Sequence, residues 1–296
     1  MSQTMQFQIQ RYLLMALDPI HAGTGASRLG RVDNSIAREP GTHLPKVPGT
    51  GLSGAIRQYA AYRNGRRECA GQGKNHHDTS TEHCPVCYTF GTGNDVGTSF
   101  SGMVSIGDAR LLLFPIYSMQ GPVWVTSASV LHDSGLAWDG NEVEGEQALF
   151  ASGLQGNYLN LGWLMVARNG DLGISDPNIP AVVQKRTVLV SEKLFSQVVN
   201  SGLEVRTSVS IDPATGAAED KALFTYEALP RASYLWMDVI QDDFRGSFPV
   251  IDGQTWKKPL DVVDAGLEWA AYLGIGGMGT RGFGRLRIES KWEVQQ

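Results

Sequence analysis

Residues 18–57 constrain the fold more than any other stretch, because they form a loop rich in Gly, Pro and Ser between two segments of regular pattern. The apolar run Tyr12–Leu17 that precedes this loop predicts a buried strand. Apolar residues at its far end follow the three- and four-residue spacing of an amphipathic helix: Leu52, Ala55, Ile56, Tyr59 and Ala60. We expect Thr50 to cap this helix, and Arg57 to project from its exposed side near the loop.

The composition of the loop suits a polyanion. Glycines let a backbone approach phosphates and offer N–H groups, while Lys and Arg neutralise charge and displace counterions. Residues 28–67 hold eight Lys or Arg against two Asp or Glu. The whole chain has a formal net charge of −5 and a pI of about 5.7, which excludes nucleic-acid binding over its entire surface. RNA binding would therefore use a local groove; the alternative is an ordinary surface loop with scattered charge.

The cysteines indicate a metal site. Cys69, Cys84 and Cys87 form an odd, clustered set, which fits metal binding in a reducing compartment better than a disulfide framework. The Cys-Pro-Val-Cys knuckle is typical of zinc sites. Residues 69–87 show no hydrophobic pattern that could order them without an ion. The alternative is a set of unrelated thiols beside a polar loop.

A histidine is expected to complete the structural Zn²⁺ site. We favour His77 over His76, and His83 is the least suited because it is adjacent to a cysteine ligand. A zinc-dependent nucleobase deaminase is excluded, because no His-x-Glu precedes the cysteines and the proline follows the first cysteine of the pair.

The second half of the chain predicts a hairpin and a second glycine-rich loop. Leu203–Ser210 and Ala222–Leu229 alternate as strands around a glycine-containing turn. A helix at Leu260–Leu273 leads into Gly274–Arg285, a further candidate for phosphate binding that precedes a terminal strand. If the strands that carry them are neighbours in one sheet, the two glycine-rich loops meet. The polar segment Leu136–Pro180 gives no clear assignment.

These motifs, in this order, resemble the repeat-associated mysterious protein (RAMP) superfamily, and more narrowly the backbone subunit of type III-B CRISPR (Cmr) complexes. The N-terminal blocks are His21-Ala22-Gly23-Thr24-Gly25, Val32-Asp33-x-x-Ile36-x-Arg38-Glu39-Pro40 and Leu44-Pro45-x-x-Pro48-Gly49-x-x-Leu52-x-Gly54-Ala55-x-Arg57. Later matches are Phe90-Gly91, Asp108-Ala109-Arg110, Leu223–Pro230 and the loop Gly274–Arg285. The resemblance therefore covers most of the chain.

The resemblance implies a fold that the strand–helix–strand order at each end of the chain also suits. This fold is α+β, with a ferredoxin-like (RNA-recognition-motif) core. A single RAMP domain would span residues 1–296. Its insertions would be a zinc-bearing finger at about 66–100 and a β-hairpin thumb at about 185–232, which in the family wedges between nucleotides.

The resemblance also implies a function. The subunit would polymerise with copies of itself in a helical filament along a CRISPR guide RNA, bind other Cmr-type subunits, and cut complementary target RNA at regular intervals. Asp33 stands at the family's catalytic aspartate. It would hold Mg²⁺ or another divalent ion that helps a ribose 2′-hydroxyl attack the adjacent phosphate, or act as base to that hydroxyl. The alternative is that Asp33 only pairs with Arg31 or Arg38.

Residues of both glycine-rich loops and of the first helix are expected to bind RNA: His21, Gly23, Arg38, Lys46, Ser53, Arg57, Gly276, Gly277, Thr280 and Arg281. Glu227 would order the thumb. Two departures from the family pattern bear on these roles. Asn34 and Ser35 replace an apolar residue and Pro beside the catalytic position, which changes the loop geometry. Ser53 replaces a Lys, which removes one expected phosphate contact.

Three hypotheses remain for the function. The first is a metal-dependent endoribonuclease subunit, the second a guide-RNA scaffold that does not cleave, and the third a zinc-stabilised binding module outside CRISPR. Steeply salt-dependent binding of single-stranded RNA would separate the first two from the third. The sequence shows no basic start followed by a long apolar run and no stretch of about 18 apolar residues, so we expect a cytoplasmic protein without a membrane partner.

Overall fold

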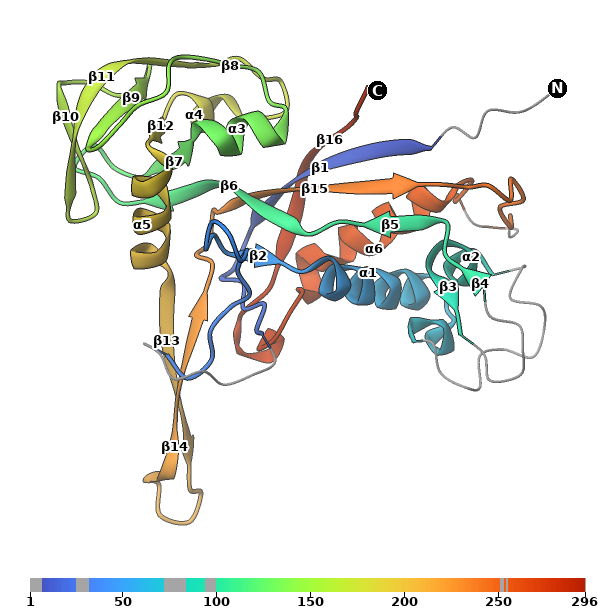
Figure 1. Cartoon of the computed structure of the whole chain (residues 1–296). Coiled ribbons are helices and arrows are strands. Elements are labelled where there is room, and N and C mark those ends of the chain that lie inside the picture. The colour runs from blue at the N-terminus through green and yellow to red at the C-terminus, as the bar shows by residue number, and fades with distance from the viewer. Residues whose placement is uncertain are drawn as a thin grey trace.

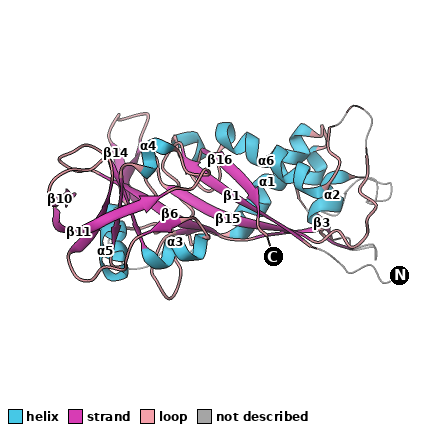
Figure 2. Ribbon diagram, turned by 90° about the horizontal axis from the view of Figure 1, so that it is seen from above, coloured by secondary structure: helices cyan, strands magenta, loops and turns pink. Residues whose placement is uncertain are grey.

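A large sheet, helices on its faces and one projecting hairpin make up the molecule (Figure 1). The computed structural model describes residues 7–24, 32–71, 84–93, 100–250, 253 and 255–295. Seen from above, the sheet runs along the length of the molecule (Figure 2). None of the helices in this described part is long and apolar enough to cross a membrane.

Both ends of the chain contribute to the centre of the sheet. The central elements, in chain order, are β1 (Gln8–Ala16), α1 (Gly49–Arg63), β6 (Ala109–Ile116), β15 (Tyr234–Gln241), α6 (Pro259–Leu273) and β16 (Leu286–Glu293). The strands lie in the order β6-β15-β1-β16, each antiparallel to its neighbour. Both helices cover the same face, where the Tyr12 hydroxyl on β1 donates to the Asp264 carboxylate on α6 (2.9 Å). The predicted first strand and both predicted helices are confirmed.

The remaining strands extend the sheet mainly beyond β6. They and the helices between them are β2 (Lys46–Val47), β5 (Val104–Ile106), β7 (Val123–Ser127), α3 (Ala128–Ser134), β8 (Trp138–Asp139), β9 (Gln147–Ala151), β10 (Tyr158–Leu161), β11 (Leu164–Ile174), α4 (Ala181–Gln184), β12 (Thr187–Val190) and α5 (Glu192–Gly202). The order continues β6-β7-β12-β9-β11-β10, while β2, β5 and β8 pair with β6, β15 and β11. Because β7–β12 and β9–β11 are parallel, the sheet is mixed.

The predicted hairpin is confirmed and stands apart from the sheet. It consists of β13 (Glu204–Ile211) and β14 (Ala218–Ala228), and it projects from the body below α5 (Figure 1). Its turn is held by the Asp212 carboxylate, which accepts from the Ala214 N–H (2.8 Å) and the Thr215 hydroxyl (2.9 Å). Such local side-chain bonds are what makes Asp a turn residue.

The start of α1 differs from the prediction. Pro48, rather than Thr50, occupies the N-cap position, and the Gly49 N–H donates to the Asp108 carboxylate (2.7 Å). Gly49 also packs closely, since a Cβ there would lie 2.4 Å from the Ile106 carbonyl oxygen. A carboxylate just before β6 therefore satisfies the first N–H of a helix 59 positions away in sequence, which a local pattern does not reveal.

A second, smaller core surrounds the cysteines. The short elements there are a 3-10 turn (Arg67–Ala70), α2 (Pro85–Phe90), β3 (Gly91–Thr92) and β4 (Phe100–Ser101). The buried residues of this cluster are Ala60, Ala61, Cys69, Cys84, Val86, Cys87, Trp256, Val262 and Ala265. The main core runs along the sheet and is a separate cluster. The described residues that carry the cysteines, 67–71 and 84–92, are called the cysteine segment below. This segment therefore packs on the ends of α1 and α6 rather than on the sheet.

Candidate nucleic-acid interface and metal site

The two glycine-rich loops meet at His21, which confirms the prediction made for loops on neighbouring strands. β1 and β16 are paired, and the Gly277 N–H donates to the His21 carbonyl (3.0 Å). Gly276 has a φ of +90°, and a Cβ there would lie 2.5 Å from the same carbonyl oxygen. Glycine is thus required at this contact for both conformation and space.

The His21 side chain faces the base of the hairpin. It is 7% exposed, and its Nδ1 lies 2.7 Å from the Glu227 carbonyl oxygen. A carbonyl only accepts, so Nδ1 carries a proton and donates it. A Cβ at Gly23 would lie 3.0 Å from Nε2, and the Tyr226 ring packs edge-on at 5.7 Å. His21 therefore joins the first loop to β14, and its contact with RNA stays a prediction.

Asp33 lies at the surface beside the same hairpin. Its Oδ2 accepts from the N–H and the hydroxyl of Thr225 on β14 (2.8 Å each), and its own N–H donates to the Thr225 hydroxyl oxygen (2.9 Å). The Thr225 N–H and hydroxyl hold the pKa of Asp33 below its ordinary value, because both donate to the ionised form. Oδ1 has no hydrogen-bond partner within the described ranges, so one ionised oxygen is open to a ligand.

Glu227 and Arg38 join the same loop to β14 from the buried side. The Glu227 carboxylate lies 2.7 Å from the Arg38 guanidinium and accepts from the Ile36 N–H (3.3 Å). Arg38 also donates to the Asn200 side chain on α5 (3.0 Å). Arg38 therefore pairs with Glu227 and not with Asp33. Arg31, the other partner considered for Asp33, lies outside the described residues.

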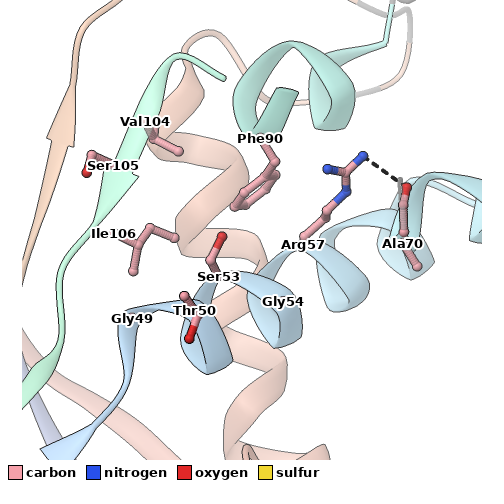
Figure 3. A pocket seen from close by; sticks show the side chains of 11 residues that line it. Gly49, Thr50, Ser53, Gly54, Arg57, Ala70, Phe90, Val104, Ser105 and Ile106 are labelled. Atoms are coloured by element: carbon pink, nitrogen blue, oxygen red, sulfur yellow. Dashed lines mark hydrogen bonds between the residues drawn. The ribbon is translucent and has the colours of Figure 1, made fainter. Parts of the chain in front are cut away.

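Other predicted RNA-binding residues lie beside the hairpin, on β2 and on α1. Arg281 donates to the Ser208 hydroxyl on β13 (2.9 Å), and its neighbour Thr280 is exposed. The Lys46 ammonium pairs with the Asp108 carboxylate (2.6 Å). Ser53 lines a cavity of about 540 Å³ between α1, β5 and the cysteine segment (Figure 3).

The prediction that Arg57 projects to solvent is wrong. This residue is 5% exposed, and its Nε, Nη1 and Nη2 donate to the carbonyls of Cys69 (2.8 Å), Gly91 (2.9 Å) and Gly71 (3.1 Å). Figure 3 shows the guanidinium turned from α1 toward the 3-10 turn that carries Ala70. The helical spacing placed Arg57 beside the apolar stripe correctly, but the cysteine segment that covers it comes from another part of the chain.

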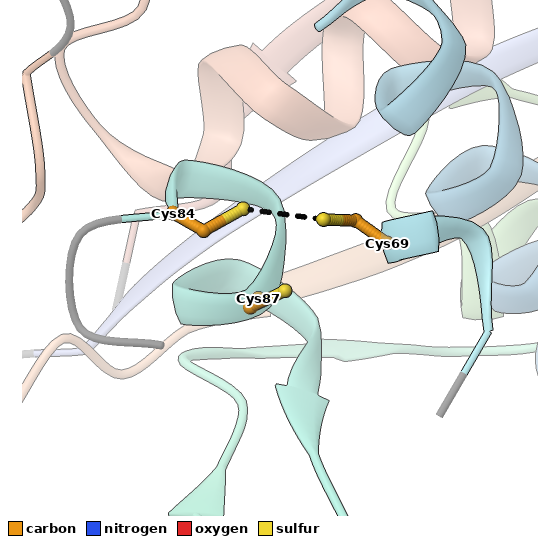
Figure 4. Close-up of side chains that lie close together, drawn as sticks. All are labelled: Cys69, Cys84 and Cys87. Carbon is orange, nitrogen blue, oxygen red and sulfur yellow. Dashed lines mark hydrogen bonds between the residues drawn. The ribbon is translucent and has the colours of Figure 1, made fainter. Parts of the chain in front are cut away.

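The three cysteines converge as a metal site requires (Figure 4). They are buried, their sulfur atoms all lie within 4.8 Å of one another, and the Sγ atoms of Cys69 and Cys84 are 3.6 Å apart. Tetrahedral zinc with thiolate bonds of about 2.3 Å places its sulfurs about 3.8 Å apart, so the donor set fits Zn²⁺. The three candidate histidines, including the favoured His77, lie outside the described residues.

A cluster of arginines that the sequence analysis did not single out surrounds Asp18. Arg285 donates to both oxygens of this carboxylate (2.5 and 3.0 Å), and together with the charges of Arg206 and Arg231 it lowers the pKa of Asp18. Arg206 also stacks over the Phe283 ring at 4.8 Å. These arginines come from distant segments, so no window of sequence shows the cluster. Since Arg285 pairs with Asp18 and Arg206 pairs with Glu204, Arg231 supplies the excess positive charge beside the second glycine-rich loop.

Comparisons with known proteins agree on one family. The RAMP superfamily model matches residues 13–287. The chain is 24% identical over 240 residues to the protein named CRISPR system Cmr endoribonuclease Cmr4 of Pyrococcus furiosus, covering 73% of this chain and 76% of the relative.

Solved structures share the fold. A chain in the cryo-EM structure of the type III-B Cmr-beta complex in its apo state superposes with a TM-score of 0.67 at 15% identity, covering 97% of this chain and 98% of that one. A chain of oligomeric Cmr4 from Pyrococcus furiosus superposes with a TM-score of 0.61 at 19% identity, covering 97% and 99%. With a family match over nearly its whole length, the chain belongs to the RAMP superfamily.

Proposed function

We propose that this chain is the backbone subunit of a CRISPR RNA-guided ribonucleoprotein. Copies polymerise along the guide RNA in a helical filament, bind other Cmr-type subunits, and cleave complementary target RNA at regular intervals. The observation that carries the chemistry is Asp33, an exposed carboxylate fixed at the base of the hairpin with one oxygen open. The name of the Pyrococcus relative, an endoribonuclease of a Cmr system, supports the same reaction.

We infer that β6, β15, β1 and β16 with α1 and α6 form a ferredoxin-like core. Their order in the chain and in the sheet is that of two interleaved strand–helix–strand units with both helices on one face. The finger (residues 66–100) and the thumb (residues 185–232) would be insertions into this core, within a single RAMP domain.

The guide RNA backbone would follow the second glycine-rich loop and the hairpin base. Gly276, Gly277, Thr280 and Arg281 are exposed there, and the arginine cluster at Asp18 supplies further positive charge. Exposed backbone N–H groups and arginines are the groups that bind phosphates without reading sequence. Lys46 and Ser53 would extend this contact toward α1.

In the proposed cleavage, the ribose 2′-oxygen attacks the adjacent phosphorus and the bond to the 5′-oxygen breaks. The 2′-hydroxyl loses its proton, the departing 5′-oxygen gains one, and the products carry a 2′,3′-cyclic phosphate and a 5′-hydroxyl. Because the pKa of Asp33 is held low, this carboxylate is a weak general base at neutral pH. Its better role is to hold a divalent ion such as Mg²⁺ through Oδ1. The ion would stabilise the charge that develops on the phosphate.

A structural zinc ion would order the finger. Cys69, Cys84 and Cys87 would supply three thiolates, and the fourth ligand would be a histidine of the 72–83 segment, with His77 favoured. The close, buried sulfur atoms support this assignment. Structural zinc sites of this kind add folding free energy directly.

The test is cleavage of a guide-complementary RNA by the assembled complex, with Mg²⁺ present or omitted and zinc held constant. We expect evenly spaced products that require Mg²⁺, and no products from an RNA without complementarity to the guide. Tight binding of the complementary RNA without products in Mg²⁺ would instead support the non-cleaving scaffold.

A further inference from the structure

Arg57 is a buried cation without a carboxylate partner in the described part of the chain. Its hydrogen bonds to the backbone go to the neutral carbonyls of Cys69, Gly71 and Gly91. No Asp or Glu among the described residues forms an ion pair with it. Removing an unpaired charge from water is costly, so a buried guanidinium requires an anion nearby.

The three cysteines lie beside Arg57, which bonds to the carbonyl of one of them, Cys69. Its guanidinium is within hydrogen-bonding reach of Cys87 and in the electrostatic field of Cys69 and Cys84. As thiols these side chains offer no charge. As thiolates around Zn²⁺ they exceed the charge of the ion by one, and a neutral histidine as the fourth ligand leaves this excess unchanged. One buried arginine balances it.

We propose that Arg57 is the counter-charge of the zinc centre and positions its ligands. The inference rests on the zinc site of the proposed function. The guanidinium neutralises the excess thiolate charge. Its bonds to the Cys69 carbonyl, on the 3-10 turn, and to the Gly91 carbonyl, just after α2, hold the two ligand-bearing segments together. Zinc-bound groups commonly depend on such outer partners for affinity.

The same contacts connect the metal to the proposed RNA surface. Arg57 lies one helical turn from Ser53 on α1, and both line the cavity of about 540 Å³ together with Ala70, Gly71 and Phe90. The wall of this cavity is therefore built partly by the segment that the zinc centre orders.

The test measures zinc affinity by competition with a chromophoric chelator, and thiolate ligation by the absorption of the Co²⁺-substituted protein. Arg57→Met should weaken zinc binding about 10- to 100-fold, and Arg57→Lys, which keeps the charge, should weaken it less. The matched control is Arg63→Met on the same helix, where Arg63 pairs with Glu268 at the surface, and it should bind zinc as the wild type does.

Two outcomes count against these assignments in different ways. Wild-type affinity in Arg57→Met would overturn the role of Arg57 while leaving the zinc site in place. Absence of zinc binding and of Co²⁺–thiolate absorption in the wild type would overturn the zinc site, and the role of Arg57 with it.

A charge-compensated background separates a charge effect from a folding defect. Cys87→His replaces a thiolate with a neutral ligand and removes the excess charge, so the further change Arg57→Met should then cost little additional affinity. The same fold-loss from Arg57→Met in both backgrounds would show that Arg57 acts solely through its carbonyl bonds, and would overturn its role as counter-charge.

Discussion

The hairpin junction, where the loop with Asp33 and Arg38 contacts β14, and the cysteine cluster lie in different parts of the molecule (Figure 1). The two regions are held by different kinds of interaction. At the junction, Asp33 is fixed by Thr225 and Glu227 by Arg38, so polypeptide groups satisfy one another. In the cluster, three thiols lie together beside a guanidinium that forms no ion pair with a carboxylate of the described residues. The junction is therefore preorganised by the chain alone, whereas the zinc ion proposed above would complete the cluster.

Metal removal should separate the two regions most strongly. With zinc about 1,000-fold above its Kd, binding adds about 4 kcal/mol of stability, which Cys84→Ser should largely remove. Amide hydrogen exchange should then speed up over α2 and the 3-10 turn, while β14 beside Asp33 keeps its protection. Equal loss of protection in both regions would contradict this difference between them.

Breaking the ion pair at the junction should destabilise the protein without affecting the cysteine cluster. Glu227 is 5% exposed, so Glu227→Gln leaves Arg38 poorly compensated and should lower the free energy of unfolding by about 2 kcal/mol. Zinc affinity should not change. The control is Glu268→Gln, whose 60% exposed carboxylate pairs with Arg63, and it should cost less than about 0.5 kcal/mol in the same urea titration. Similar losses of unfolding free energy in both variants would show that the buried pair adds no more stability than a surface pair.

Two glycines of the second loop test how tightly the junction is packed. Gly282 has a φ of +79°, and a Cβ added there would meet no atom within 4 Å, so Gly282→Ala should cost about 1 kcal/mol from backbone strain. Gly276→Ala adds a clash with the His21 carbonyl and should cost about 1 to 3 kcal/mol more. Equal thermal stability of the two variants would mean that the loops do not pack at His21 as described.

The smallest effect is expected from Thr225→Val. The variant keeps the N–H bond to Asp33 but loses the hydroxyl, so the pKa of Asp33 should rise toward its ordinary value. A lowered pKa adds stability that is present above the unfolded-state value and lost as pH falls through the folded-state value. The stability that the variant loses through Asp33 should therefore be present at pH above about 5 and disappear as the pH falls through the folded-state pKa, and the Asp33 carboxyl titration followed by NMR would show the rise in pKa. An unchanged titration would contradict the bond.

The sequence predicted the features that depend on local pattern. Tyr12–Leu17 is a continuous apolar run and corresponds to β1, and the alternation on both sides of Asp212 corresponds to the hairpin. The three cysteines could be grouped from their spacing alone. In each case neighbours in the chain determine the structure, so the pattern and the fold agree.

Contacts between distant residues were not predictable in this way. Asp33 and Thr225 are 192 positions apart, and no periodicity links an aspartate to one particular threonine. Arg57 was predicted to be exposed because its position on the helix lies outside the apolar stripe. The cysteine segment that covers Arg57 has no hydrophobic pattern that would have predicted this contact. Asp108 as the cap of α1 and the arginines at Asp18 are further cases in which the fold, rather than a motif, brings charges together.

The role of Asp33 is tested most directly by single-turnover cleavage of guide-complementary RNA, with complexes assembled from wild-type or Asp33→Asn subunits. Asparagine keeps an oxygen that can accept the Thr225 bonds but lacks the charge that would hold a divalent ion. We expect evenly spaced products from the wild type, a rate at least about 100-fold lower with Asp33→Asn, and equal affinity of both complexes for the target RNA. Cleavage by Asp33→Asn at the wild-type rate would contradict this role and place the chemistry elsewhere.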